Sequence, residues 1–275
     1  MKTSSTETHG QREPKRTGPK HLPTSARDLA SQTSSPRIKR IAFSVLSTFL
    51  ISIGTCPASN IWLTGHDVLY HTGQNGNDAV ALNYLRTRCK SSPIPATNYT
   101  IAVLGSGVGT WGPSIYPALL GYSALNVTYF QMPLSAATWA NLTTGPLSKN
   151  LLMINSHTSC SGCDVSDAGV TEINAHAAQI RAALNGGMDL YVESGAKNLN
   201  YYNFLPPGFA VAGSSISGKS GFLATPAGVA AGLSPNMLNG FETHNRFNGY
   251  SSALTVMEVR PITGGIEVIT LAACN

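Results

Sequence analysis

The sequence predicts a three-layer α/β fold with a doubly wound, mostly parallel sheet and a C-terminal β-hairpin. Three observations carry this prediction. Residues 151–192 read as strand, loop, helix and strand, which is one βαβ unit. Upstream of that unit, short apolar runs alternate with helical patterns. Downstream, two apolar runs, 254–259 and 266–271, flank a short segment that contains Pro261 and Gly265.

The βαβ unit is the best-marked part of the chain. Residues 151–154 form an apolar run, and a loop of polar side chains follows at 155–164. Apolar residues then recur every three or four positions from Val170 to Leu184, which predicts a helix with one buried face. Ser166 or Asp167 is placed to cap its start, and glycines follow its end. Residues 188–192 predict the next strand.

The other elements can be read in chain order around this unit. Apolar runs predict strands, three- to four-residue spacing predicts helices, and Asp78 is placed to cap the first helix. We expect strands at 60–64, 99–104 and 126–132, and helices at 78–89, 113–125 and 135–142. Beyond Glu193, we expect short strands at 209–217 and 221–225, then an irregular excursion at 226–250 before the hairpin. One domain, 60–275, is the simplest account.

The first 58 residues differ in composition from the rest. Residues 1–40 hold nine Lys or Arg against three acids and almost no large apolar residues, which predicts a disordered basic tail. Residues 41–58 combine a basic flank, an uncharged apolar run and small residues, which predicts a signal peptide or an uncleaved signal anchor. A buried core helix is the alternative. We therefore expect an extracytoplasmic protein, secreted or membrane-anchored, that meets the membrane only through 41–58.

The charge pattern argues against a nucleic-acid partner, and the glycine pattern argues against a bound nucleotide. The net charge is +5, but residues 41–275 hold nine basic and ten acidic residues, so the expected domain is nearly neutral and no nucleic-acid partner is expected. Gly107, Gly109 and Gly112 fit a dinucleotide-binding pattern. However, Pro113 interrupts the helix such a site needs, and no acid occurs between Asp78 and Asp164, so no nucleotide is expected.

The cysteines allow several chemistries. In an exported domain, disulfides are expected among Cys89, Cys160, Cys163 and Cys274, with the connectivity open. Cys160 and Cys163 form a C-x-x-C motif just before the predicted helix, so a redox dithiol is an alternative to a local structural disulfide. A zinc site would need two further ligands, for which only His157 lies nearby.

Polar side chains follow two of the predicted parallel strands. His66, Asp67 and His71 come after the first strand, and His157 follows the strand at 151–154. The carboxyl ends of parallel strands meet at one edge, so these groups could hold a divalent metal or act as acid and base. His244 could join them from the late excursion. Loop-organising hydrogen bonds are the alternative for each residue.

Several segments together resemble a known group. They are GHDVLYH at 65–71, LLMINSHTSCSGCD at 151–164, the helix and strand to Ser194, and GLSPNMLNGFETHNRF at 232–247. The chain is similar over about 60–272 to uncharacterised exported bacterial proteins with a flavodoxin-like, class I glutamine amidotransferase-like core, a group that includes trehalose-utilisation-like proteins. Amidases of that fold carry a cysteine on a tight glycine-flanked turn. Here the turn lacks glycines, so a surviving triad would use Cys160 or Ser156 with His244 or His157.

Three functions remain open at this level. The first is a binding or surface protein whose ligand is a small molecule or a cell-surface group. The second is a hydrolase, dependent on a metal or on Cys or Ser, that acts at the strand-end loops. The third is a thiol-disulfide redox protein that uses Cys160 and Cys163. Because the sequence identifies neither a cofactor nor a catalytic site, it leaves enzyme activity undecided.

Overall fold

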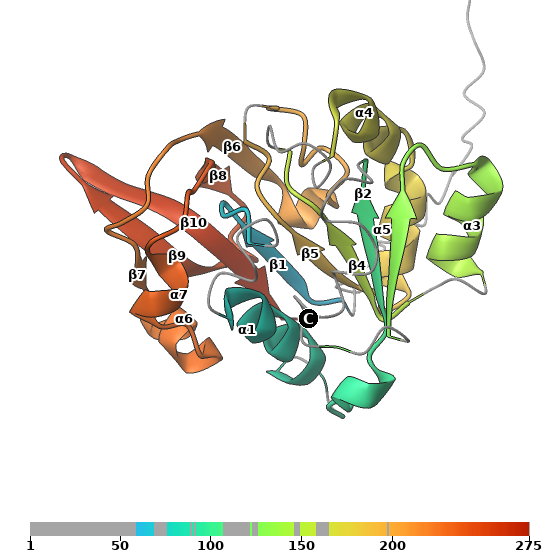
Figure 1. Cartoon of the computed structure of the whole chain (residues 1–275), viewed down its shortest axis with the longest axis horizontal. Helices are drawn as coiled ribbons and strands as arrows, with labels where there is room; N and C mark the ends of the chain where they lie inside the picture. Colours follow the sequence, from blue (N-terminus) through green and yellow to red (C-terminus); the bar gives the residue numbers. More distant parts are fainter. Residues whose placement is uncertain are drawn as a thin grey trace, which may run out of the picture. The chain divides into compact units, whose positions relative to one another are not determined.

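Two kinds of strand pairing meet in a single sheet (Figure 1). The computed structural model describes residues 59–68, 76–88, 90, 92–106, 122, 126–145, 149–157, 165–196 and 198–274. In these residues a ten-stranded sheet has the order β3-β2-β4-β5-β1-β10-β8-β6, with β9 beside β10 and β7 beside β9. The strands are β1 (Ile61–Thr64), β2 (Ile101–Gly105), β3 (Val127–Gln131), β4 (Leu151–Ile154), β5 (Asp189–Val192), β6 (Val211–Ser215), β7 (Leu223–Ala224), β8 (Asn245–Tyr250), β9 (Thr255–Ile262) and β10 (Gly265–Ala273).

The first five strands along the chain form the parallel part of the sheet. β3, β2, β4, β5 and β1 are parallel neighbours in that order, whereas β10 pairs antiparallel with β1 and begins the second part. β9 and β10 are antiparallel partners that meet at Ile262 and Gly265. The predicted mixed α/β fold with a mostly parallel central sheet is therefore confirmed.

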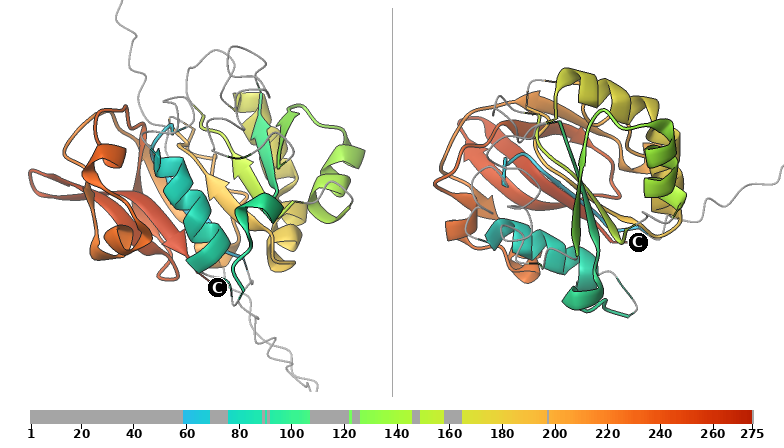
Figure 2. Two further views of the ribbon diagram at one scale, coloured as in Figure 1. Left: turned by 60° about the horizontal axis from the view of Figure 1, so that its bottom comes forward. Right: turned by 45° about the vertical axis from the view of Figure 1, so that its right-hand side comes forward.

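Helices cover both faces of the parallel strands (Figure 2). One core layer packs α3, α4 and α5 against one face, and the other packs α1 and its π-helical extension against the opposite face, with α6 and α7 farther along. Alternate residues of each strand enter opposite layers, as Leu190 and Tyr191 do on β5. The helices are α1 (Asn77–Asn83), η2 (Tyr84–Arg88), η3 (Ala96–Asn98), α3 (Ala136–Thr144), α4 (Asp167–Ala175), α5 (Ala177–Asn185), η4 (Pro207–Phe209), α6 (Pro226–Ala231) and α7 (Pro235–Leu238).

The predicted βαβ unit is present as β4, α4, α5 and β5. Ser166 is the N-cap, because its hydroxyl accepts a hydrogen bond from Gly169 N at 3.1 Å. The single helix expected from Val170 to Leu184 is divided at His176, which ends α4 and precedes α5. The apolar face still continues through both helices, since Val170, Ile173 and Ile180 share one core layer.

Two expectations about helices and strands are wrong. Gly76, with a φ of 94°, caps α1, and Asp78 lies inside the first turn. Residues 226–250 are not irregular, because they contain α6, α7 and β8. Thr225 caps α6 through a bond from Gly228 N, and Pro226 begins the helix, so the local start signals were present. β8 lacks an apolar run because its inward positions are Asn245 and Phe247.

Several sequence predictions lie outside the described residues. These are the basic tail and the apolar segment at 1–58, His71, the glycine pattern at 107–112, most of the helix expected at 113–125, and three of the cysteines. The described residues belong to a compact unit, Ile53–Asn275. Within them, none of the helices has both the length and the apolar composition that a membrane crossing requires.

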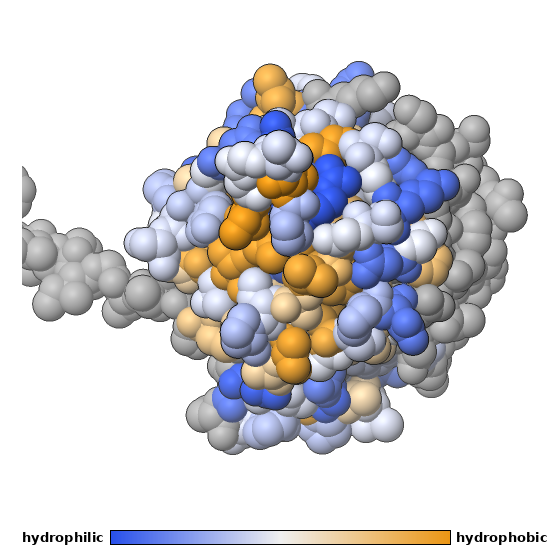
Figure 3. All heavy atoms as spheres, turned by 90° about the vertical axis from the view of Figure 1, so that its left-hand side faces the viewer, coloured by the Kyte–Doolittle hydropathy of each residue, from blue (hydrophilic) through white to orange (hydrophobic). Residues whose placement is uncertain are grey.

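Exposed apolar side chains gather on the side that carries α6 and the outer strands. Figure 3 shows this side, where orange groups run between polar ones. The exposed large apolar residues of β7, α6, β9 and β10 are Leu223, Val229, Ile262 and Ile266.

Candidate functional site

The carboxyl ends of β1, β4 and β5 bring two acids to one serine. Ser156 Oγ donates a hydrogen bond to Asp67 Oδ1 at 2.7 Å, and Ser156 N donates to Glu193 Oε2 at 3.3 Å. Ser156, Asp67 and Glu193 are 1%, 2% and 0% exposed. We call these three residues the strand-end cluster. Buried carboxylates are rare unless they are hydrogen-bonded or functional.

The backbone fixes the positions of the cluster. His157 N donates to Ser194 O at 2.7 Å, and Ser194 N donates to His66 O at 3.2 Å. These bonds continue the ladder of β4, β5 and β1 beyond the strands. Ser156 can reach Asp67 although β5 lies between β4 and β1. The site edge is therefore held by main-chain bonds as well as by side chains.

Buried phenols surround the acids. Burial raises the pKa of Tyr191 well above its ordinary value, and the charges of Glu193, Asp78 and Asp67 raise it further. Burial likewise raises the pKa of Tyr201, with further contributions from Tyr202, Glu193 and Asp67. Both phenols therefore remain protonated. Tyr201 Oη donates to Asn155 O, which anchors the 198–205 segment to the end of β4.

His66 points to a different set of partners from its neighbour Asp67. Its Nε2 lies 2.7 Å from Glu258 Oε1, and its Nδ1 lies 2.8 Å from Thr243 Oγ1. Thr270 Oγ1 donates to the other oxygen of Glu258 at 2.6 Å. All four residues are at most 1% exposed, and the ring of Phe222 packs edge-on against His66 at 5.3 Å between centroids. We call Thr243, His66, Glu258 and Thr270 the His66 network.

This network joins the two parts of the sheet. His66 follows β1 of the parallel part, whereas Glu258 and Thr270 belong to β9 and β10 of the antiparallel part. Both ring nitrogens of His66 are already within hydrogen-bonding distance of protein oxygens, so the described arrangement leaves neither of them for a metal. His66 therefore fits a structural role better than a site role.

Of the remaining predicted site residues, the structure describes His157 and His244. His157 Nε2 lies 3.0 Å from Asp167 Oδ1. His157 Nδ1 is buried and has no hydrogen-bond partner among the described residues. His244 lies beside the end of β1, since its N donates to Gly65 O at 3.0 Å. His71, Cys160 and Cys163 lie outside the described residues, and no group of three His, Cys, Asp or Glu suited to a metal occurs among the residues that are described.

Asp78 is a further buried acid that sequence reasoning assigned only to a helix cap. It is 2% exposed, and its Oδ1 accepts from Ala79 N at 2.8 Å, while Oδ2 has no partner in the described part of the chain. Burial raises its pKa to about 7. The buried carboxylate of Asp189 differs from that of Asp78 in that both of its oxygens have partners. It accepts hydrogen bonds from Asn60, Lys90 and Tyr99.

One member of the strand-end cluster and one member of the His66 network had signals that sequence reasoning did not use. Glu193 follows the buried run of β5 directly, just as Ser156 and Asp67 come two and three residues after the ends of β4 and β1. Glu258 is a single acid inside an apolar strand, where an unpaired charge would be costly.

Comparison with known proteins adds no assignment. No protein-family model matches the sequence, and no curated protein shows significant similarity to it.

Proposed function

We propose that this is an exported ligand-binding protein with a class I glutamine amidotransferase-like, flavodoxin-like scaffold closed by a C-terminal β-hairpin, and that its ligand binds at the strand-end cluster. The observation that carries the proposal is the bonding of Ser156 to both Asp67 and Glu193. In open α/β sheets, ligands bind outside the carboxyl ends of the strands. Here three neighbouring strand ends present polar groups at that position.

The chemistry of the cluster suggests the kind of ligand. Ionised carboxylates only accept hydrogen bonds, so they favour a ligand that donates them through hydroxyl or ammonium groups. Such bonds are stronger where water is excluded, and both acids are almost fully buried. A small hydroxylated amine or sugar satisfies this requirement.

Export is supported by two independent features. Residues 41–58 have the pattern of a signal peptide or signal anchor. Cys274 is disulfide-bonded, and structural disulfides are typical of oxidising compartments. The protein would then be secreted or anchored through 41–58, with a small molecule or cell-surface group as its ligand.

A hydrolase is the second candidate, because Thr243, His66 and Glu258 have the hydroxyl–imidazole–carboxylate order of a catalytic triad. Each of the three is 0% exposed. A nucleophile must touch its substrate, and the strand-end cluster, at most 2% exposed, must likewise touch its ligand, so either function requires this edge of the sheet to open. A metal site that includes His71, and a redox role for Cys160 and Cys163, remain proposals on residues outside the described part of the chain.

Binding to a hydroxylated amine tests the function. We expect D-glucosamine, titrated by calorimetry, to bind the wild-type protein more tightly than D-glucose does. Asp67→Asn and Glu193→Gln keep the side-chain shape but remove the charge. Each should weaken binding of D-glucosamine by about tenfold or more, because a hydrogen bond to a charged group contributes about 1.5–3 kcal/mol.

Ser215→Ala is the control for the two acid variants. Ser215 is exposed on β6, away from the strand-end cluster, so its replacement should leave the affinity unchanged. Circular dichroism and melting curves identify variants that fail to fold. Equal affinity in wild type, Asp67→Asn and Glu193→Gln would refute the proposed site.

The cysteine prediction is tested separately by thiol titration. In denatured, unreduced protein we expect no more than one free thiol, that of Cys56 if the signal segment is retained. The four cysteines of the domain should react only after reduction. Two or more free thiols before reduction would contradict the disulfides and weaken the case for export.

A further inference from the structure

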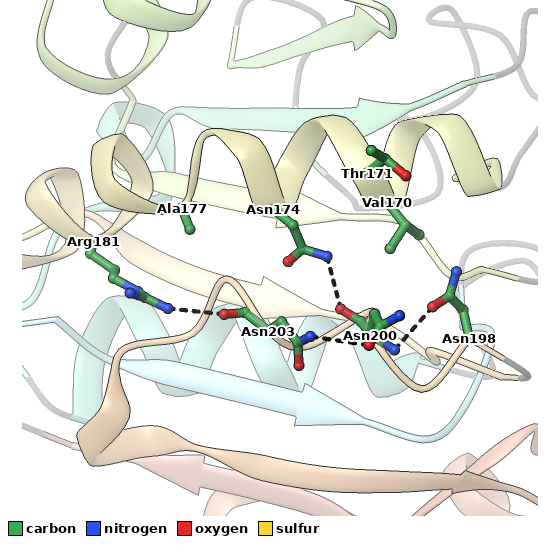
Figure 4. A pocket seen from close by; sticks show the side chains of 8 residues that line it. All are labelled: Val170, Thr171, Asn174, Ala177, Arg181, Asn198, Asn200 and Asn203. Atoms are coloured by element: carbon green, nitrogen blue, oxygen red, sulfur yellow. Dashed lines mark hydrogen bonds between the residues drawn. The ribbon is translucent and has the colours of Figure 1, made fainter.

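A polar groove lies beside the strand-end cluster but uses different residues. It runs between α4 and α5 on one side and the turns at 198–203 on the other, and it encloses about 480 Å³ (Figure 4). That volume is within the range of small-molecule sites. The lining residues are Val170, Thr171, Asn174, Ala177, Arg181, Asn198, Asn200 and Asn203. Four of these eight are asparagines, and none is acidic.

The asparagines are held in place by one another. Asn174 Nδ2 donates to Asn200 O at 2.9 Å, and Asn203 Nδ2 donates to Asn200 Oδ1 at 3.2 Å. Asn200 N donates to Asn198 Oδ1 at 3.0 Å. Asn174 Oδ1 has no hydrogen-bond partner among the described residues. Amide groups that are already ordered lose little entropy when they bind a ligand.

Arg181 adds a fixed positive charge at one end of the groove. Its Nε donates to Phe204 O at 3.0 Å, and its Nη2 donates to Asn203 O at 2.9 Å. Both acceptors are neutral backbone carbonyls, and none of the ion pairs among the described residues includes Arg181. The guanidinium is therefore oriented without being neutralised.

The groove is also electrically polar along its length. Asp167 lies at the opposite end, where its Oδ1 accepts from Asn198 Nδ2 at 2.9 Å. A ligand that carries one negative group would direct it toward Arg181 and away from Asp167. The amides between these ends offer both donors and acceptors, which suits neighbouring hydroxyl groups.

We infer that the groove binds an acidic sugar, with the carboxylate at Arg181 and the hydroxyl groups at Asn174, Asn200 and Asn203. Arginine pairs with carboxylates through parallel hydrogen bonds. Val170 and Ala177 supply an apolar wall for the C–H face of the ring. This site is independent of the strand-end cluster and would belong to a protein that meets uronic-acid polymers.

Titration with trigalacturonate tests the inference, with maltotriose as the neutral control and trialanine as a peptide carboxylate. We expect trigalacturonate to bind the full chain most tightly. Arg181→Gln should weaken this binding by about tenfold or more. Thr171→Glu places a negative charge in the groove without altering Arg181, and it should weaken binding in the same direction.

Asp67→Asn separates this site from the strand-end cluster, because it should leave trigalacturonate binding unchanged. The inference is overturned if trigalacturonate does not bind at millimolar concentration, or if maltotriose or trialanine binds as tightly. It is also overturned if both Arg181→Gln and Thr171→Glu, shown by melting curves to be folded, keep the wild-type affinity.

Discussion

Replacement of Glu258 by alanine is expected to lower the melting temperature by about 10 °C. The change removes the acceptor of His66 Nε2 and of Thr270 Oγ1, all of them buried. A buried hydrogen-bonding group that loses its partner costs about 1–3 kcal/mol, and two groups lose their partner here. For a domain of this size each kcal/mol corresponds to about 2–4 °C. Differential scanning calorimetry measures the shift.

A matched control and a mutant cycle make this prediction specific. Thr255→Ala, at an exposed position on the same strand, should change the melting temperature by only about 1–2 °C. If His66 and Glu258 act as a pair, the double variant His66→Ala/Glu258→Ala should be less destabilised than the sum of the single variants. A melting temperature for Glu258→Ala within 2 °C of wild type would show that the His66 network contributes little to the stability of the fold.

Asp78 should make stability fall as the pH rises. Its pKa is raised from 3.8 to about 7 in the folded protein, so the folded state holds the proton more tightly than the unfolded state does. Its contribution is therefore fully present below about pH 4 and is lost between about pH 4 and 7. Because each pKa unit corresponds to 1.36 kcal/mol, the loss is on the order of 4 kcal/mol.

Urea denaturation of wild type and Asp78→Asn between pH 4 and pH 8 checks this behaviour. The amide keeps the acceptor for Ala79 N but cannot ionise. At pH 4 the two proteins should have similar free energies of unfolding, and at pH 8 the variant should be the more stable. A difference between them that does not change with pH would contradict the prediction. Other titrating groups occur in both proteins and cancel.

Local patterns predicted the parallel half of the fold well. The apolar runs of β1, β2, β4 and β5 are buried on both faces, so each gives a clear signal. β8 gives a weak one, because Arg246 and Asn248 alternate with its inward residues. The division at His176 was not predictable from periodicity, since the apolar face continues across it.

The position of the strand-end cluster was predictable from the sequence, but the hydrogen-bond partners of its residues were not. Parallel strand ends share an edge, which places Asp67 near Ser156. The order β4-β5-β1 decides that Glu193 completes the cluster, and no local pattern encodes that order. His66 shows the same limit of local patterns. Its partner Glu258 lies on β9, which is remote in sequence, so the sequence alone groups His66 with Asp67. In the structure the two side chains bond to different neighbours.

Chemical-shift mapping with isotope-labelled protein and D-glucosamine tests the central claim most directly. If the carboxyl ends of β1, β4 and β5 form the ligand site, the largest amide shifts will occur at Asp67, Ser156, His157, Glu193 and Ser194. Glu193→Gln will reduce these shifts at the same ligand concentration. The largest shifts in the asparagine-lined groove or on the outer strands, or none at saturating concentration, would contradict the claim.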